Sequence, residues 1–123
     1  MLDHVIINVS DYDAARAFYS HALAPLGLEV VIEGDSMCGF GEGGKPELWV
    51  AERDEPSAPV HVAVRSPDHA TVDAFHRAAL DAGGRDHGAP GPRPQYHQGY
   101  YGAFVLDPDG NNIEAVCHQP AAG

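Results

Sequence analysis

Residues 100–116 read YYGAFVLDPDGNNIEAV, and this stretch decides the fold. The DPDG segment at 107–110 predicts a tight turn, because proline fixes φ and glycine permits positive φ. Apolar residues on both sides of the turn predict two strands joined as a β-hairpin. The second strand carries Glu114 among apolar residues, and a carboxylate is costly to bury without a partner. Glu114 therefore needs a partner, and we predict that this partner is a metal ion.

Length and charge limit the classes of function. A chain of 123 residues is long enough for one domain with a substantial core. Its 18 Asp and Glu against 7 Lys and Arg give a formal charge of −11, which argues against nucleic acid and against an anionic membrane surface as partners. No run of 18 apolar residues and no leader-like segment is present, so we expect a cytoplasmic protein. Cys38 and Cys117 lie in strand-like contexts and are expected to be buried thiols.

Hydrophobic periodicity divides the chain into two similar halves. In the first half it predicts a strand over 2–9, a helix over 11–24 with Ser10 as N-cap, and strands over 28–32, 37–40 and 48–51. The polar, Pro-rich residues 53–59 predict a linker. In the second half it predicts a strand over 60–65, a helix that begins after the N-cap Ser66 and ends at Gly83, a strand near 85–88, a loop over 89–99 and the hairpin. We therefore expect a single domain over 1–123, with module one at about 1–52 and module two at about 60–118.

Shifting the chain by 57 residues tests whether the modules are related. The shift superposes His4 on His61, Val5 on Val62, Phe18 on Phe75, Ala22 on Ala79, Leu23 on Leu80, and Gly27 on Gly84. Repeats of this kind bury together what neither half can bury alone. The predicted fold class is α+β, with two β-α-β-β-β modules forming a curled mixed sheet around a central groove. The alternative is two unrelated αβ stretches.

The repeat also predicts companions for Glu114. The last strand of module one carries Glu47, 67 residues earlier, and the ten residues beyond the repeat fall in the loop over 89–99. His4 and His61 stand on the first strand of each module. Two imidazoles and two carboxylates suit Zn, Ni, Co, Mn or Fe(II), and they leave positions open for water or substrate. Taken singly, a strand histidine is more often a core residue, and Glu47 also reads as a surface strand end.

The sequence resembles the vicinal oxygen chelate superfamily, which includes glyoxalase I, extradiol dioxygenases, and bleomycin and fosfomycin resistance proteins. The matching segments are LDHV at 2–5, the segment 11–19 with AFY at 17–19, LG at 26–27, VHVA at 60–63 and the segment 101–116 with DPDGNNIEAV. The resemblance covers nearly the whole chain. It implies paired β-α-β-β-β modules around one divalent metal ion, with His4, Glu47, His61 and Glu114 at the ligand positions. It also implies a homodimer, in some members with ligands from two chains.

Three departures from the superfamily's patterns bear on the substrate. Asn8 stands where glyoxalase I has a basic residue for the carboxylates of glutathione, and Ala51 stands where an asparagine is expected, so a glutathione substrate is not indicated. Phe104 stands where extradiol dioxygenases have an acid tyrosine, which argues against catechol cleavage. Alternation along the strands and the aromatic loop predict a different set of substrate-binding residues. These are Asn8, Trp49, Arg65, Tyr96, His97, Tyr101 and Asn112.

The predicted function is a metal-dependent glyoxalase-like enzyme, of isomerase or lyase type, acting on a small oxygenated metabolite. The metal polarises a substrate oxygen, and Glu114 or Glu47 acts as the catalytic base. Two alternatives stay open: a metal-free resistance protein that sequesters an aromatic drug, and an Fe(II)-dependent dioxygenase. For Trp49 and Arg65 the non-functional interpretations are a core aromatic residue and a surface arginine.

Overall fold

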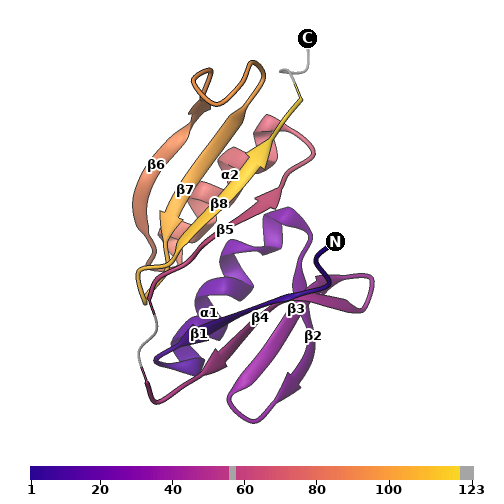
Figure 1. Cartoon of the computed structure of the whole chain (residues 1–123), viewed down its shortest axis with the longest axis vertical. Helices are drawn as coiled ribbons and strands as arrows, with labels where there is room; N and C mark the ends of the chain where they lie inside the picture. Colours follow the sequence, from indigo (N-terminus) through magenta and orange to yellow (C-terminus); the bar gives the residue numbers. More distant parts are fainter. Residues whose placement is uncertain (56–57, 120–123) are drawn as a thin grey trace.

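The sequence repeat corresponds to two modules with the same order of elements in a computed structural model that describes residues 1–55 and 58–119 (Figure 1). Module one contains β1 (Val5–Val9), α1 (Tyr12–Ala22), the short 3₁₀ helix η1 (Ala24–Leu26), β2 (Glu29–Gly34), β3 (Met37–Glu42) and β4 (Lys45–Glu52). Module two contains β5 (His61–Arg65), α2 (His69–Asp81), β6 (Arg85–Pro92), β7 (Tyr101–Leu106) and β8 (Asn112–Cys117). The predicted α+β class with two β-α-β-β-β modules is confirmed. Residues 56–57 of the predicted linker lie outside the described residues.

Each module has its own four-stranded mixed sheet. The strand order is β1-β4-β3-β2 in module one and β5-β8-β7-β6 in module two. In both sheets the first strand pairs in parallel with the last, and the other pairs are antiparallel. The last strand of each module is therefore internal to its sheet. That position brings Glu114 next to the strand that starts at His61.

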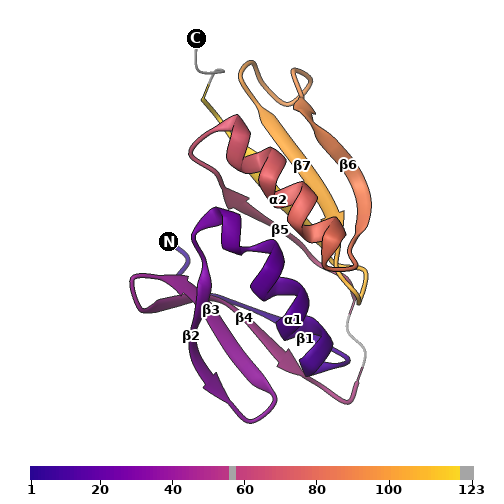
Figure 2. The ribbon, with the colours of Figure 1, turned by 180° about the vertical axis from the view of Figure 1, so that it is seen from behind.

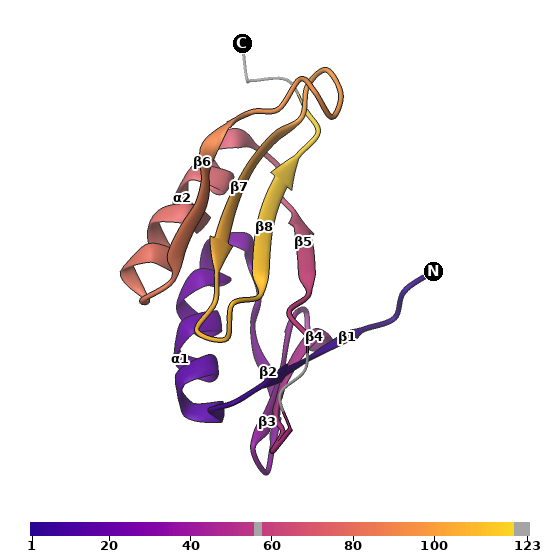
Figure 3. The same ribbon diagram turned by 60° about the vertical axis from the view of Figure 1, so that its left-hand side comes forward.

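Both helices cover the same side of the two sheets, as the view from behind and the side view show (Figures 2 and 3). In α1 the residues Ala15, Phe18, Tyr19 and Ala22 recur every three or four positions and are buried, as the periodicity predicts. They join residues of both modules in one hydrophobic cluster, which also includes the free thiols of Cys38 and Cys117. The alternate side chains of the strands point to the opposite face of the sheets. That face carries the four predicted metal ligands His4, Glu47, His61 and Glu114.

The predicted hairpin is confirmed as β7 and β8, and its turn at 107–110 joins the two modules. Asp107, only 1% exposed, accepts a hydrogen bond from the Tyr19 hydroxyl of α1 at 2.5 Å. The backbone N–H groups of Asp109 and Asn111 donate to Asp107 Oδ1, and the Asn111 side chain donates to Oδ2. Asp109 in turn accepts from the backbone N–H of Ser10. The turn therefore fixes module two on the first helix of module one.

Both predicted helix N-caps are wrong by one or two residues. The N-cap of α1 is Asp11, whose carboxylate accepts from Ala14 N at 3.1 Å, and the Ser10 amide donates to Asp109. The N-cap of α2 is Asp68, which accepts from Thr71 N at 2.7 Å, while the Ser66 hydroxyl donates to the backbone carbonyl of Asp68. In both places an aspartate follows the serine by one or two residues in the sequence. The aspartate caps the helix, while the serine forms a different hydrogen bond.

The prediction of a loop beginning at residue 89 is wrong, because β6 continues to Pro92. This strand lies at the edge of its sheet, where a proline without an N–H is tolerated. Two register shifts against β7 accommodate the Gly and Pro residues. Within the described residues, no helix is both long and apolar enough to cross a membrane.

Candidate metal and substrate site

Glu114 and His61 form the centre of the candidate site. Their strands β8 and β5 are parallel neighbours, and Glu114 lies opposite Ala63, two residues beyond His61. His61 Nε2 lies 2.8 Å from Glu114 Oε1. The Glu114 side chain is 2% exposed and the His61 side chain is 52% exposed. The carboxylate that the sequence singled out is thus buried, and an accessible imidazole covers one of its oxygens.

Tyr100 covers the other oxygen of Glu114. Its hydroxyl donates to Glu114 Oε2 across a short contact. Burial, followed by the hydrogen bond and the negative charge of Glu114, raises the pKa of Tyr100 well above its usual value. Tyr100 is therefore a neutral donor that holds the carboxylate in one orientation. Gly102 permits this approach, since a Cβ there would lie 3.2 Å from Glu114 Oε2.

Two adjoining cavities open over this pair. One, of about 260 Å³, is lined by His61, Tyr96, Tyr100, Phe104 and Glu114. The second, of about 350 Å³, is lined by His61, His87, Gly88, Arg93, Tyr96, Phe104 and Asn112. They share His61, Tyr96 and Phe104, so a ligand can extend from one into the other. Aromatic walls with a few polar groups are typical of small-molecule sites.

His4 and Glu47 lie together on module one. The β1 and β4 register begins at Val5 opposite Leu48, so the preceding residues, His4 and Glu47, share one end of the sheet. His4 Nδ1 contacts Asp3 at 2.8 Å, its side chain is 47% exposed, and Glu47 is exposed. Each module therefore presents one histidine and one glutamate on the face opposite the helices.

The register corrects one step of the repeat argument. Ile6 pairs with Trp49 in module one, and Ala63 pairs with Glu114 in module two. The first strands are related by 57 (63 − 6), and the last strands by 65 (114 − 49), not by 67. Trp49 is therefore the repeat equivalent of Glu114, and Glu47 is two residues away from that position. Side chains alternate along a strand, so Glu47 still shares the face of Trp49.

The donors of one described chain fit a metal ion only in part. In residues 1–55 and 58–119, no three His, Cys, Asp or Glu side chains gather in a way that could hold an ion. Two ligands with bonds of about 2.1 Å at right angles are about 3 Å apart. The 2.8 Å between His61 Nε2 and Glu114 Oε1 is compatible with that spacing. These two residues fit two positions around a divalent ion, and further ligands have to come from elsewhere.

Comparison with known proteins assigns the family. Residues 1–115 match the family model described as the Glyoxalase/Bleomycin resistance protein/Dioxygenase superfamily. The chain belongs to this superfamily. No curated protein matches the sequence.

Solved structures agree with this assignment. A glyoxalase/bleomycin resistance protein from Albidiferax ferrireducens T118 is 25% identical, with 95% of this chain and 98% of that chain covered and a TM-score of 0.86. A glyoxalase/bleomycin resistance protein/dioxygenase family enzyme from Burkholderia phytofirmans PsJN is 22% identical, with coverage of 94% and 96% and a TM-score of 0.73. A lactoylglutathione lyase from Agrobacterium tumefaciens is 21% identical, with coverage of 95% and 92% and a TM-score of 0.69. At these identities the last two show the glyoxalase fold alone.

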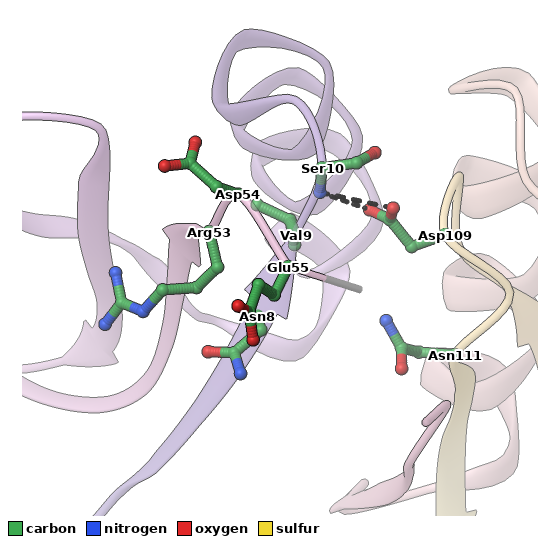
Figure 4. A pocket seen from close by; sticks show the side chains of 8 residues that line it. All are labelled: Asn8, Val9, Ser10, Arg53, Asp54, Glu55, Asp109 and Asn111. Atoms are coloured by element: carbon green, nitrogen blue, oxygen red, sulfur yellow. Dashed lines mark hydrogen bonds between the residues drawn. The ribbon is translucent and has the colours of Figure 1, made fainter. Parts of the chain in front are cut away.

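Two residues that the sequence assigned to the substrate lie on module one of this superfamily member. Asn8 lines a separate cavity of about 270 Å³ at the junction of the modules, where Asp109 holds Ser10 (Figure 4). The other residues around that cavity are Val9, Arg53, Asp54, Glu55 and Asn111. Trp49 is partly buried and lies close to Gly39, where an added Cβ would meet its ring at 3.0 Å. Neither residue lines the cavities over Glu114.

The other predicted substrate residues divide into two groups. Tyr96 and Asn112 line the cavities at His61. His97 lies just beyond them, with its ring 5.2 Å from the Tyr100 ring and its Nε2 3.0 Å from His118 Nδ1. Tyr101 points to the helix side of β7 and donates to Asp73 at 2.7 Å.

Arg65 lines a further cavity near His118, apart from Glu114. His87, Phe104 and Arg93 line the site although the sequence did not predict them as substrate residues, whereas Tyr100 belongs to the aromatic segment that the sequence places near the metal. Phe104 lies opposite Glu114 on the neighbouring strand β7, so pairing of the two strands would have indicated it. The loop that carries Tyr100 and Arg93 has no periodicity from which to infer their directions.

Proposed function

We propose that this superfamily member is a metal-dependent glyoxalase-like enzyme, of isomerase or lyase type, that acts on a small oxygenated metabolite. The observation that supports the proposal best is the buried Glu114 with His61 on one oxygen, beneath two cavities of small-molecule size. A buried carboxylate beside an open imidazole is a typical reactive arrangement. A cytoplasmic location is part of the proposal.

The proposed metal ligands are His4, Glu47, His61 and Glu114. Because the described part of one chain gathers no three such groups, we propose that a homodimer brings the His4 and Glu47 pair of one copy to the His61 and Glu114 pair of its partner. A divalent ion bound there, Zn, Ni, Co, Mn or Fe(II), supplies the polarisation of a carbonyl or enol oxygen of the substrate.

Glu114 is the proposed catalytic base, and Glu47 is the second candidate. Glu114 Oε1 contacts His61, which lines the cavity, whereas Oε2 accepts a hydrogen bond from the Tyr100 hydroxyl. With Glu114 not coordinated, a proton taken from the carbon next to the substrate oxygen is received at Oε1 and returned to a neighbouring carbon. Tyr100 keeps the carboxylate oriented through both transfers, and the aromatic wall of Tyr96 and Phe104 excludes water. The neutral groups of Asn8 and Ala51 give no support for a glutathione adduct as substrate.

Metal analysis of protein purified without chelators tests this proposal. We expect one divalent ion per pair of His61 and Glu114, and at least about a hundredfold weaker metal binding in His61→Ala and Glu114→Gln. Glu47→Gln tests the less supported ligand, and Glu42→Gln, which changes another exposed glutamate of module one, is the control. Size-exclusion chromatography should give a dimer whose formation strengthens with metal. Protein without stoichiometric metal, with His61→Ala unchanged in ligand binding, would contradict the enzyme and favour the metal-free, drug-sequestering alternative.

A second candidate is an Fe(II)-dependent dioxygenase, and the Tyr100 hydroxyl favours it. The sequence indicates no acid tyrosine, because Phe104 occupies the position where extradiol dioxygenases have one. Tyr100 nevertheless brings a phenol to Glu114 from the loop. Bound iron together with substrate-dependent oxygen uptake would support this candidate. Another metal with no oxygen uptake would leave the isomerase or lyase.

A further inference from the structure

The cavity beside His61 is lined by an arginine, Arg93. Arg93 donates to the backbone carbonyls of Gly91 at 2.9 Å and Ala89 at 2.8 Å, and its guanidinium lies 5.5 Å from the centre of the Phe104 ring. Among the described residues no carboxylate lies within ion-pair distance of Arg93. Arg16 is paired with Glu33, whereas Arg53, Arg65, Arg77 and Arg85 also have no ion pair among the described residues. What distinguishes Arg93 is its place on the wall of a cavity, where backbone carbonyls, including that of Pro92 at 3.4 Å, hold the guanidinium in the absence of a carboxylate among the described residues.

The other polar groups around Arg93 also favour an anion. The cavity of about 350 Å³ is lined by His61, His87 and Asn112 as well as Arg93, and by no Asp or Glu. In a chain with a net charge of −11, a cavity without a carboxylate on its lining is a local reversal of charge. Asn112 also lines this cavity and adds a neutral side-chain amide to its polar groups.

The adjoining cavity at Glu114 is mainly aromatic. Tyr96, Tyr100 and Phe104 form its walls, and it shares His61 and Phe104 with the cavity at Arg93. A ligand that fills both therefore has an apolar or aromatic body at one end and an anionic group at the other. One guanidinium supplies one full positive charge, which matches a monoanion such as a carboxylate.

We propose that Arg93 binds the carboxylate of the substrate, and that the substrate class is an aromatic or otherwise apolar hydroxy acid. The carboxylate lies against Arg93, the hydroxyl lies on the side of the cavity lined by His61 and the Asn112 amide, and the apolar body lies between Tyr96 and Phe104. This inference rests on the proposed function for the claim that the ligand is a substrate. The binding itself requires neither metal nor turnover.

Binding of mandelate and mandelamide to EDTA-treated full-length protein tests the inference. The two ligands share ring and hydroxyl and differ only in the charge. We expect mandelate to bind at least about tenfold more tightly than mandelamide, as for a charge-assisted pair, and to shift NMR signals of His61, Phe104 and Asn112. Arg93→Gln should remove this preference, and the control Arg77→Gln, on the exposed surface of α2, should retain it.

A second measurement needs no variant. Raising the salt concentration should weaken mandelate binding to the wild-type protein and leave mandelamide binding nearly unchanged, since salt screens the charged contact alone. Equal affinity for the two ligands, no binding of mandelate, or an Arg93→Gln protein that keeps the preference would each overturn the inference. Because metal is absent from every arm, failure of the proposed metal chemistry leaves the result interpretable.

Discussion

Replacing Tyr19 with phenylalanine removes a single hydroxyl from the junction of the two modules. That hydroxyl donates to Asp107 at 2.5 Å, and both side chains are almost completely buried. Burial, followed by the negative charge of Asp107, raises the pKa of Tyr19 well above its ordinary value, so the hydroxyl stays a donor. The phenylalanine ring occupies the same space, so Tyr19→Phe creates no cavity of ring size.

The expected loss of stability depends on the hydrogen bonds that Asp107 retains when the Tyr19 hydroxyl is removed. A hydrogen bond to a charged group contributes about 1.5–3 kcal/mol. Asp107 retains the backbone N–H groups of Asp109 and Asn111 on one oxygen and the Asn111 side chain on the other. The carboxylate is thus left with fewer donors but not without any. We expect Tyr19→Phe to lower the free energy of unfolding by about 2 kcal/mol, and the thermal midpoint by roughly 6–10 °C.

Urea unfolding followed by circular dichroism measures this loss. The slope of free energy against urea should be unchanged, and the midpoint should fall by about 1 M. Tyr12→Phe is the matched control, because its hydroxyl also donates to a carboxylate, Glu33 at 3.1 Å, but at the exposed surface. The control should lose no more than about 0.5 kcal/mol. A Tyr19→Phe protein as stable as Tyr12→Phe would refute the role given to the Tyr19 and Asp107 contact.

The remaining predictions concern the tyrosines and Gly102. Four of the five tyrosines have raised pKa values: Tyr12 and Tyr101 at about 12, and Tyr19 and Tyr100 well above their usual value. Because folding favours the neutral phenols, their contribution to stability is fully present below the unfolded pKa of about 10 and is lost as pH rises through about 12. At pH 11 the folded protein should therefore show far less tyrosinate absorbance at 295 nm than the urea-unfolded chain, and equal absorbance would contradict this. Gly102→Ala places a Cβ 3.2 Å from Glu114 Oε2 and should weaken metal binding about tenfold with little loss of stability, whereas Gly34→Ala, where the contact is an ordinary 3.5 Å, should change neither.

The fold was predictable because its signals are local or periodic. The turn at 107–110, the helix periodicity and the 57-residue shift are all visible in the sequence. The helix N-caps were missed because Asp11 and Asp68, one and two residues after the predicted serines, supply the capping carboxylates. The identification of Glu47 as the equivalent of Glu114 failed for a related reason. Sequence spacing does not fix strand register, and the register makes Trp49 the equivalent.

The candidate site was predictable at its centre and not at its rim. A charged residue inside an apolar strand identifies Glu114 without any structure, and the repeat identifies His61. Tyr100 and Arg93 come from a loop, where alternation gives no direction to a side chain. Sequence reasoning placed Tyr101 at the site, but the structure turns it toward α2 and brings its neighbour Tyr100 to Glu114. One residue of displacement on a strand moves a side chain to the opposite face.

The turn and the strands of the hairpin perform separate tasks, and this separation explains why a single stretch governs both fold and site. The turn holds module one through Tyr19 and Ser10, whereas Glu114 lies in the middle of β8 and Tyr100 reaches it from the open end. A change at the turn should therefore lower stability while the Tyr100, Glu114 and His61 contacts persist in the molecules that remain folded. A change at Gly102 should instead disturb the Tyr100 and Glu114 contact and leave stability nearly unchanged. Since β8 is internal to its sheet and held at the turn, Glu114 is presented from a strand supported on both sides, which suits its proposed role as base or metal ligand.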